Sequence, residues 1–76
     1  MTVAELKVRL RNEGISPDAY SIGGPLPKYE GLILEVSNDR WKIEHFERGI
    51  RRELETFSSE EKACERMYDL LMKHFR

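Results

Sequence analysis

The sequence predicts an α+β domain in which two helices flank a run of antiparallel strands. Apolar residues recur at helical spacing near both ends of the chain, and they alternate with polar residues through its middle. Turn-forming residues separate these segments. The predicted order is α-β-β-β-α, with one apolar face on the sheet. We therefore expect an antiparallel sheet of three strands, or four with a short extra one, and both helices packed on one face.

The first helix is predicted over residues 3–13. Thr2-x-x-Glu5 matches a capping box, in which two side chains satisfy amides at a helix start. Apolar residues then recur at helical spacing, and Gly14 suits the position after a helix end. Residues 16–18, Ser-Pro-Asp, should form a short turn, since proline suits a position that needs no amide hydrogen.

The second helix is predicted over residues 59–75. Ser58-x-x-Glu61 has the pattern of a second capping box. An apolar stripe at helical spacing follows it and should pack on the sheet. The stripe contains Ala63, Cys64, Met67, Leu70, Leu71, His74 and Phe75.

Strands are predicted where apolar and polar residues alternate with a period of two. Residues 32–36, 41–45 and 50–54 follow this pattern. Residues 20–22 are a candidate for a short additional strand. The Pro- and Gly-rich residues 23–31 should form a loop, and they lack the pattern of a phosphate-binding loop.

Side-chain pairing predicts the register of both hairpins. A turn at residues 38–39 sets Val36 opposite Trp41 and keeps the apolar residues on one face.

The second hairpin has two possible even-numbered loops. A two-residue loop would set Glu44 opposite Glu53, which is unfavourable. A four-residue loop, residues 46–49, would set Glu44 opposite Arg51 and Lys42 opposite Glu53. We therefore expect the four-residue loop, closed by a glycine with positive φ.

The composition favours one small domain and argues against two classes of function. The chain has 76 residues, so its core is thin and there is little room for a deep substrate pocket. Its net charge is −1, whereas a general nucleic-acid binder is normally clearly basic. We accordingly expect a single domain spanning residues 1–76.

The compartment is predicted from cysteine usage and the absence of targeting signals. Cys64 is the only cysteine, so no internal disulfide can form. The first residues lack the basic and apolar regions of a secretory signal, and no apolar run has the ~18 residues of a membrane span. These features predict a cytoplasmic protein without membrane contact.

No constellation of residues predicts catalysis, a metal site or a cofactor. His45 and His74 are the only histidines, and Cys64 has no Cys or His at metal-ligand spacing. We interpret His45 as a hydrogen-bonded structural residue on the inward face of its strand. Ser58 and Ser59 are better explained as caps than as nucleophiles. We expect no enzymatic activity.

The predicted contact surface for a partner has three parts. The first is the hairpin tip, where Arg48 projects beside Phe46 and Glu47, a composition typical of an interface anchor. Phe46 could equally fold back onto the edge of the core. The second is the loop around Tyr29. The third is the exposed face of the sheet, which contains Glu35, Lys42, Glu44, Arg51 and Glu53.

The element order resembles that of the double-stranded RNA-binding domain. That resemblance implies a lysine-rich start to the second helix that reaches phosphates. Here Glu60 and Glu61 stand at this position and would repel a phosphate backbone. We keep the topology and reject the function. A module that binds nucleic acid or regulates through Arg48, Arg51 and Arg52 remains the alternative.

A second resemblance covers most of the chain. Its central motif is Trp41-x-Ile43-x-x-x-Glu47-Arg48-Gly49. This motif is preceded by Gly14-Ile15-x-x-x-x-Tyr20 and a Gly-rich loop, and it is followed by Phe57-x-Ser59-Glu60-x-x-Ala63-Cys64. It is similar to small bacterial immunity proteins found beside polymorphic or contact-dependent toxins.

The resemblance implies a non-enzymatic inhibitor that binds a cognate toxin domain and blocks its active site or substrate access. It matches residues 47–49 to the turn of the family and Trp41 to the aromatic residue of its strand. Either match can reflect a structural role, with the contacts to the toxin lying elsewhere. If the toxin were a nuclease, an acidic patch would suit its basic cleft; the candidates are Glu53, Glu55, Glu60 and Glu61. We expect a monomer or a weak homodimer through a sheet edge.

Overall fold

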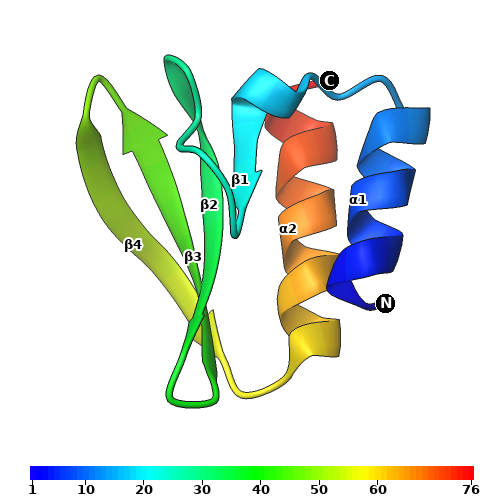
Figure 1. Cartoon of the computed structure of the whole chain (residues 1–76), viewed down its shortest axis with the longest axis vertical. Helices are drawn as coiled ribbons and strands as arrows, with labels where there is room; N and C mark the ends of the chain where they lie inside the picture. Colours follow the sequence, from blue (N-terminus) through cyan, green and yellow to red (C-terminus); the bar gives the residue numbers. More distant parts are fainter.

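The computed structural model describes residues 1–76 and has two layers, a sheet and a pair of helices (Figure 1). Both helices cover one face of the sheet, here called the inner face; the opposite face is the outer face. The predicted α+β class is confirmed. The elements are α1 (Val3–Asn12), η1 (Pro17–Ala19), β1 (Tyr20–Ile22), β2 (Glu30–Ser37), β3 (Arg40–Glu47), β4 (Ile50–Phe57) and α2 (Glu60–His74).

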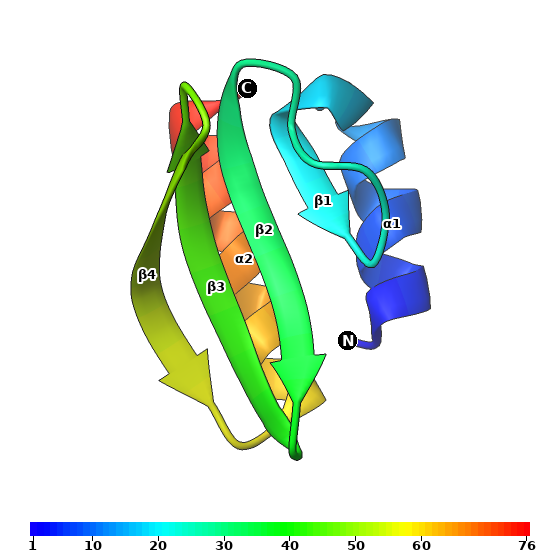
Figure 2. The ribbon, with the colours of Figure 1, turned by 60° about the vertical axis from the view of Figure 1, so that its left-hand side comes forward.

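The sheet has four strands in the order β1-β2-β3-β4. The predicted antiparallel part is confirmed in β2, β3 and β4, and the candidate strand at residues 20–22 is present as β1. β1 is parallel to β2, so the sheet is mixed. Residues 23–29 return the chain along the outer side of the sheet to make this parallel pair possible (Figure 2).

The first hairpin has the predicted register. Val36 lies opposite Trp41, and Glu35 lies opposite Lys42. The turn residues Asn38 and Asp39 have φ angles of 51° and 62°. Positive φ at both central residues is the requirement of a type I′ turn, whose twist matches the flanking strands.

The predicted four-residue loop of the second hairpin is wrong. β3 and β4 are joined by a two-residue turn, residues 48–49, with φ angles of 53° and 81°. Glu44 therefore lies opposite Glu53, and Lys42 lies opposite Thr56. Turn geometry prevails because a cross-strand charge pair contributes only about 0.2–1 kcal/mol. Arg51 also reaches Glu44 diagonally without being its direct partner.

A β-bulge follows along β4. The register shifts between Ile43 and Glu44, whose partners are Glu55 and Glu53, so Leu54 is the extra residue. The bulge changes which residues of β4 point inward. Phe57 consequently lies opposite Trp41 and packs against the core.

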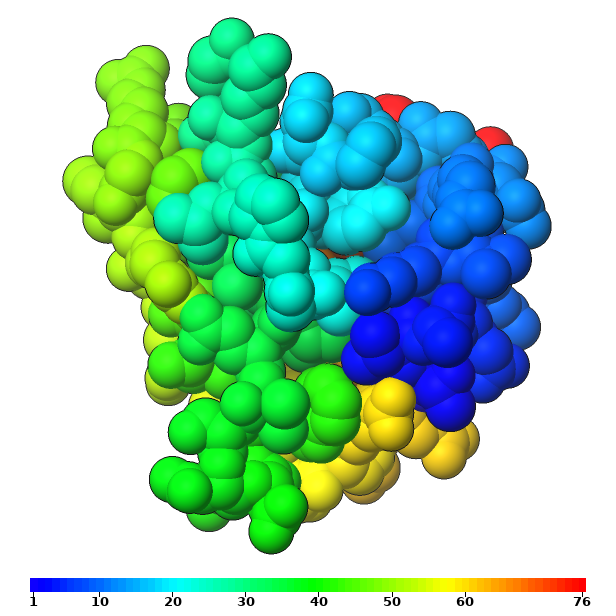
Figure 3. All heavy atoms as spheres, in the orientation of Figure 1, coloured from blue at the N-terminus to red at the C-terminus, as the bar shows by residue number.

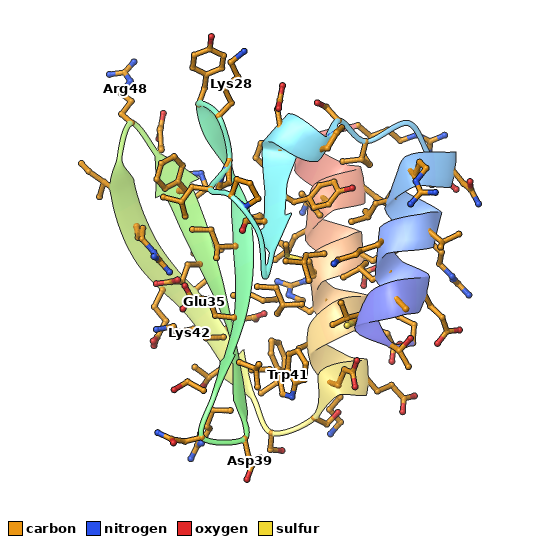
Figure 4. The ribbon with its side chains drawn as sticks, in the orientation of Figure 1. Lys28, Glu35, Asp39, Trp41, Lys42 and Arg48 are labelled. Carbon is orange, nitrogen blue, oxygen red and sulfur yellow. The ribbon has the colours of Figure 1, made fainter.

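The core lies between the inner face and the two helices. Eleven buried residues form one cluster, in which α1 supplies Leu6 and Leu10 and α2 supplies Met67 and Leu71. Trp41 points from β3 toward α2 (Figure 4). Burying these apolar side chains is the main stabilising contribution to a domain of this size.

The helix starts are capped as predicted in one case and not in the other. Thr2 and Glu5 form the predicted capping box of α1. The cap of α2 is Ser59, which accepts from the amide of Lys62 at 3.0 Å, so the prediction of Ser58 is wrong by one residue. Glu60 is then free to accept the amide hydrogen of Val3 at 2.8 Å and thereby joins the two helix starts.

Candidate functional site

Two segments far apart in the sequence form one end of the sheet. The amide of Arg48 in the β3–β4 turn donates to the carbonyl of Tyr29 at 3.2 Å. The amide of Lys28 donates to the carbonyl of Asp18 at 3.0 Å. Figure 3 shows the two segments as neighbouring prominences with a hollow between them. The two prominences and the hollow between them are together called the tip. The hollow is lined by Lys28, Tyr29, Glu30, Phe46, Glu47, Arg48 and Gly49.

The tip presents an exposed aromatic side chain on a fixed backbone. Tyr29 is 75% exposed, and the ammonium nitrogen of Lys28 lies 5.6 Å from the centre of its ring. Arg48 and Lys28 point outward from the two prominences (Figure 4). Ile50, just beyond the turn, is 69% exposed. Exposed aromatic and arginine side chains on a rigid backbone have the composition of an interface hot spot.

Phe46 is not an exposed contact residue of this tip. It is 8% exposed and lies opposite Gly31 on the outer face. Ile33 is also buried on that face, outside the main core cluster. Phe46 is therefore folded back and buried, but on the outer face and outside the main core cluster.

The predicted contact residues of the outer face form an ion network. Arg51 donates to the carboxylates of both Glu35 and Glu44. The ammonium of Lys42 lies 3.8 Å from the carboxylate of Glu44. Glu44 is only 8% exposed, so the prediction that it is an exposed residue of this face is wrong. Two hydrogen bonds raise the pKa of Arg51: the one to Glu44 has the larger effect and the one to Glu35 the smaller. Both stabilise the charged guanidinium.

Glu53 is the exception among these residues. It is exposed on β4 and makes no ion pair within 4.0 Å. Its direct neighbour across the strands is Glu44, whose charge is already balanced by Arg51. Of the predicted outer-face residues, Glu53 is the most available to a partner.

The three arginines of the nucleic-acid alternative do not share one surface. Arg51 is directed to the outer face by its bonds to Glu35 and Glu44. Arg52 lies opposite His45 on the inner face, and Arg48 occupies the turn. Side chains of adjacent strand residues point to opposite faces, so Arg51 is separated from Arg48 and Arg52, which line one concavity with His45 and Glu47.

His45 makes the hydrogen bond expected of a structural histidine. Its Nε2 lies 2.9 Å from a carboxylate oxygen of Glu30, and the histidine side chain is 26% exposed. Glu47 lies two residues farther along β3 and directly opposite Glu30. One donor atom from each of these three residues lies within 4.8 Å of the other two. The only sequence signal for this cluster is the His-x-Glu pattern on one strand. That pattern alone does not predict a three-residue cluster, because Glu30 joins it only through the strand register.

The single cysteine lies in the core, apart from this cluster. Cys64 is fully buried in the core, and burial raises the pKa of its thiol, with the negative charge of Glu60 adding to the effect. A neutral thiol is a poor nucleophile. Every buried polar side-chain atom has a hydrogen-bond partner.

Comparison of the chain with protein-family models, with curated proteins and with solved structures finds no match. None of the helices combines the length and the apolar character that crossing a membrane would require.

Proposed function

We propose that this chain is a non-enzymatic binding protein that uses the tip to contact a protein partner. The observation that carries the proposal is the exposed side chain of Tyr29, whose backbone carbonyl accepts a hydrogen bond from the amide of Arg48 in the turn. A fixed backbone reduces the conformational entropy lost when a partner binds. Tyrosine and arginine are enriched among the residues that contribute most to binding.

We further propose that the partner is a toxin domain and that the chain acts as its immunity protein. The support is the resemblance in the segment from Trp41 to Gly49, which includes the turn of the tip. Contact alone is sufficient for this role, since covering an active site blocks it without any reaction. The cytoplasm is the compartment in which such a protein would meet its toxin.

The distribution of charge favours a protein partner over a nucleic acid. The net charge is −1, and Arg51 is engaged in ion pairs with two glutamates of the outer face. Glu47 stands beside Arg48 at the tip, so the charge there is mixed. Mixed charge contributes to the choice of a specific protein partner, whereas phosphate binding requires an excess of positive charge.

The test is binding and rescue with the product of the gene immediately upstream. We expect a one-to-one complex and restored growth when the two proteins are produced together. Tyr29→Ala and Arg48→Ala should each weaken the complex by about tenfold or more, because each removes a side chain of the proposed hot spot. Tyr29→Phe keeps the ring and should retain most of the affinity.

The matched control is Lys7→Ala, an exposed residue on α1 away from the tip. It should bind and rescue like the wild type. An absent complex would refute the toxin assignment. A complex that is equally strong with Tyr29→Ala, Arg48→Ala and Lys7→Ala would place the contact elsewhere. Affinity for generic RNA that falls steeply with salt would favour the nucleic-acid alternative.

A further inference from the structure

The open end of the inner face contains two carboxylates that no cationic side chain balances. Glu30 and Glu47 lie directly opposite each other on β2 and β3. No Lys or Arg nitrogen lies within 4.0 Å of either carboxylate, and the side chain of Glu30 contacts only the imidazole of His45. Like charges that are directly opposed on neighbouring strands are destabilising.

The other opposed pair of glutamates in the sheet provides a comparison. Glu44 and Glu53 also lie opposite each other, and Arg51 balances Glu44 there. At Glu30 and Glu47 the group beside the carboxylates is the imidazole of His45, which is a metal ligand when neutral. Arg51 therefore supplies the positive charge beside Glu44 and Glu53, whereas beside Glu30 and Glu47 a metal ion bound by the imidazole could supply it.

We propose that Glu30, His45 and Glu47 bind a divalent transition-metal ion of the Zn²⁺ class. One donor atom of each residue lies within 4.8 Å of the others. Ligand atoms about 2.0–2.2 Å from a tetrahedral zinc ion are roughly 3.3–3.6 Å apart, so small side-chain rotations suffice. Imidazole with carboxylates suits Zn²⁺, Co²⁺ or Ni²⁺ better than Mg²⁺ or Ca²⁺, which prefer oxygen ligands alone.

The sheet positions the three ligands, since two share β3 and the third is fixed by the β2–β3 register. On binding, the ion would replace the hydrogen bond between His45 and Glu30. Three protein ligands leave a fourth position for water. Arg48 and Arg52 line the same concavity as His45 and Glu47 and would lower the affinity by repulsion.

The test is titration of the metal-free protein with Zn²⁺, in competition with a chromophoric chelator, and with Co²⁺ observed by visible absorption. We expect one ion per chain and the visible bands of tetrahedral Co²⁺. His45→Asn, Glu30→Gln and Glu47→Gln should each weaken Zn²⁺ binding at least tenfold, because loss of a direct ligand should cost no less than loss of an outer-shell partner. Circular dichroism establishes that each variant is folded.

Two variants serve as controls. His74→Asn removes the other histidine, which lines a neighbouring groove with Glu30 and His45. Glu35→Gln removes a carboxylate of the outer face. Both should bind Zn²⁺ like the wild type. NMR of the wild-type imidazoles provides a readout without substitution: Zn²⁺ should shift the nitrogen resonances of His45 and leave those of His74 in place.

Three outcomes would overturn the proposal. The first is Zn²⁺ affinity no stronger than millimolar. The second is affinity that His45→Asn leaves unchanged. The third is loss of binding in His74→Asn or a shift of the His74 resonances in place of those of His45, which would identify a different site.

Discussion

At the scale of single residues, Arg51 decides how the outer face is balanced. Its guanidinium bonds two glutamates from two different strands, and one of them, Glu44, is nearly buried. A buried carboxylate is costly without a partner. Arg51 therefore contributes to stability and is a poor candidate for a partner contact, although its residue type and place in the sequence favoured one.

Arg51→Met should lower the melting temperature more than Lys42→Ala does. The first change removes the hydrogen-bonded partner of Glu44, whereas Lys42 is 3.8 Å from that carboxylate. Thermal unfolding of both variants measures the difference. Adding Glu44→Gln to Arg51→Met should recover part of the loss, because the uncompensated charge is then gone. Equal melting temperatures for the two single variants would contradict this role.

Cys64 should react with a thiol reagent only when the protein unfolds. Burial raises the pKa of the thiol, so the folded state holds it neutral as well as covered. Labelling with Ellman's reagent in the native state should be slow and should become rapid in denaturant. Rapid labelling under native conditions would mean that α2 separates from the sheet readily.

At the scale of elements, the first helix depends on its capping box. Two hydrogen bonds with Thr2 lower the pKa of Glu5: the one with the Thr2 backbone has the larger effect, and the one with the Thr2 side chain the smaller. A carboxylate with a lowered pKa in the folded state contributes stability at pH values above its ordinary pKa. That contribution is lost as the pH falls through the lowered pKa.

Thr2→Ala should cost about 1 kcal/mol of unfolding free energy at neutral pH, the usual value for a lost helix cap. Glu5→Ala should also destabilise at neutral pH, and its difference from the wild type should shrink as the solution is acidified. Denaturant unfolding at several pH values measures both. A difference between wild type and Glu5→Ala that does not change with pH would contradict the capping role of the carboxylate.

At the scale of the whole molecule, the tip exists because residues 23–29 pass close over the outer face. A Cβ at Gly31 would lie 2.1 Å from the carbonyl oxygen of Ala19 and 2.8 Å from the Cβ of Pro27. Only glycine permits this approach. The passage brings Tyr29 to the Arg48 turn and adds β1 to the sheet.

Gly31→Ala should destabilise the protein by about 1–3 kcal/mol, as overpacking of a closed site does. It should also weaken partner binding, because the segment that presents Tyr29 must move. Gly24→Ala is the matched control, since a Cβ there meets nothing within 4 Å. Denaturant unfolding of both variants measures the effect. A stability of Gly31→Ala equal to that of Gly24→Ala would contradict the close passage.

The exposed edge of β4 has features that oppose pairing with a second chain. The bulge at Leu54 interrupts its hydrogen-bonding pattern. Arg51, Arg52, Glu53 and Glu55 place charges along it. Charged, bulged edges resist edge-to-edge association. This favours the monomer over the homodimer, and sedimentation at high concentration distinguishes them.

The helices, the three main strands and the first hairpin could be predicted from the amino-acid sequence. These depend on patterns within a few residues, namely helical spacing, alternation and the capping box around Thr2 and Glu5. The candidate strand at residues 20–22 was also readable, although its parallel pairing was not. A cap shifted by one residue, at Ser59 in place of Ser58, is an error of the same local scale.

The loop of the second hairpin, the burial of Phe46 and the assembly of the tip depend on contacts between segments that are distant in the sequence. The two-residue turn is tolerated because Arg51 balances Glu44 diagonally, a contact that pairing of direct neighbours does not include. The tip and the cluster of Glu30, His45 and Glu47 each join residues from separate segments. Such proximity depends on strand register and chain crossing, which one sequence does not encode in any local pattern.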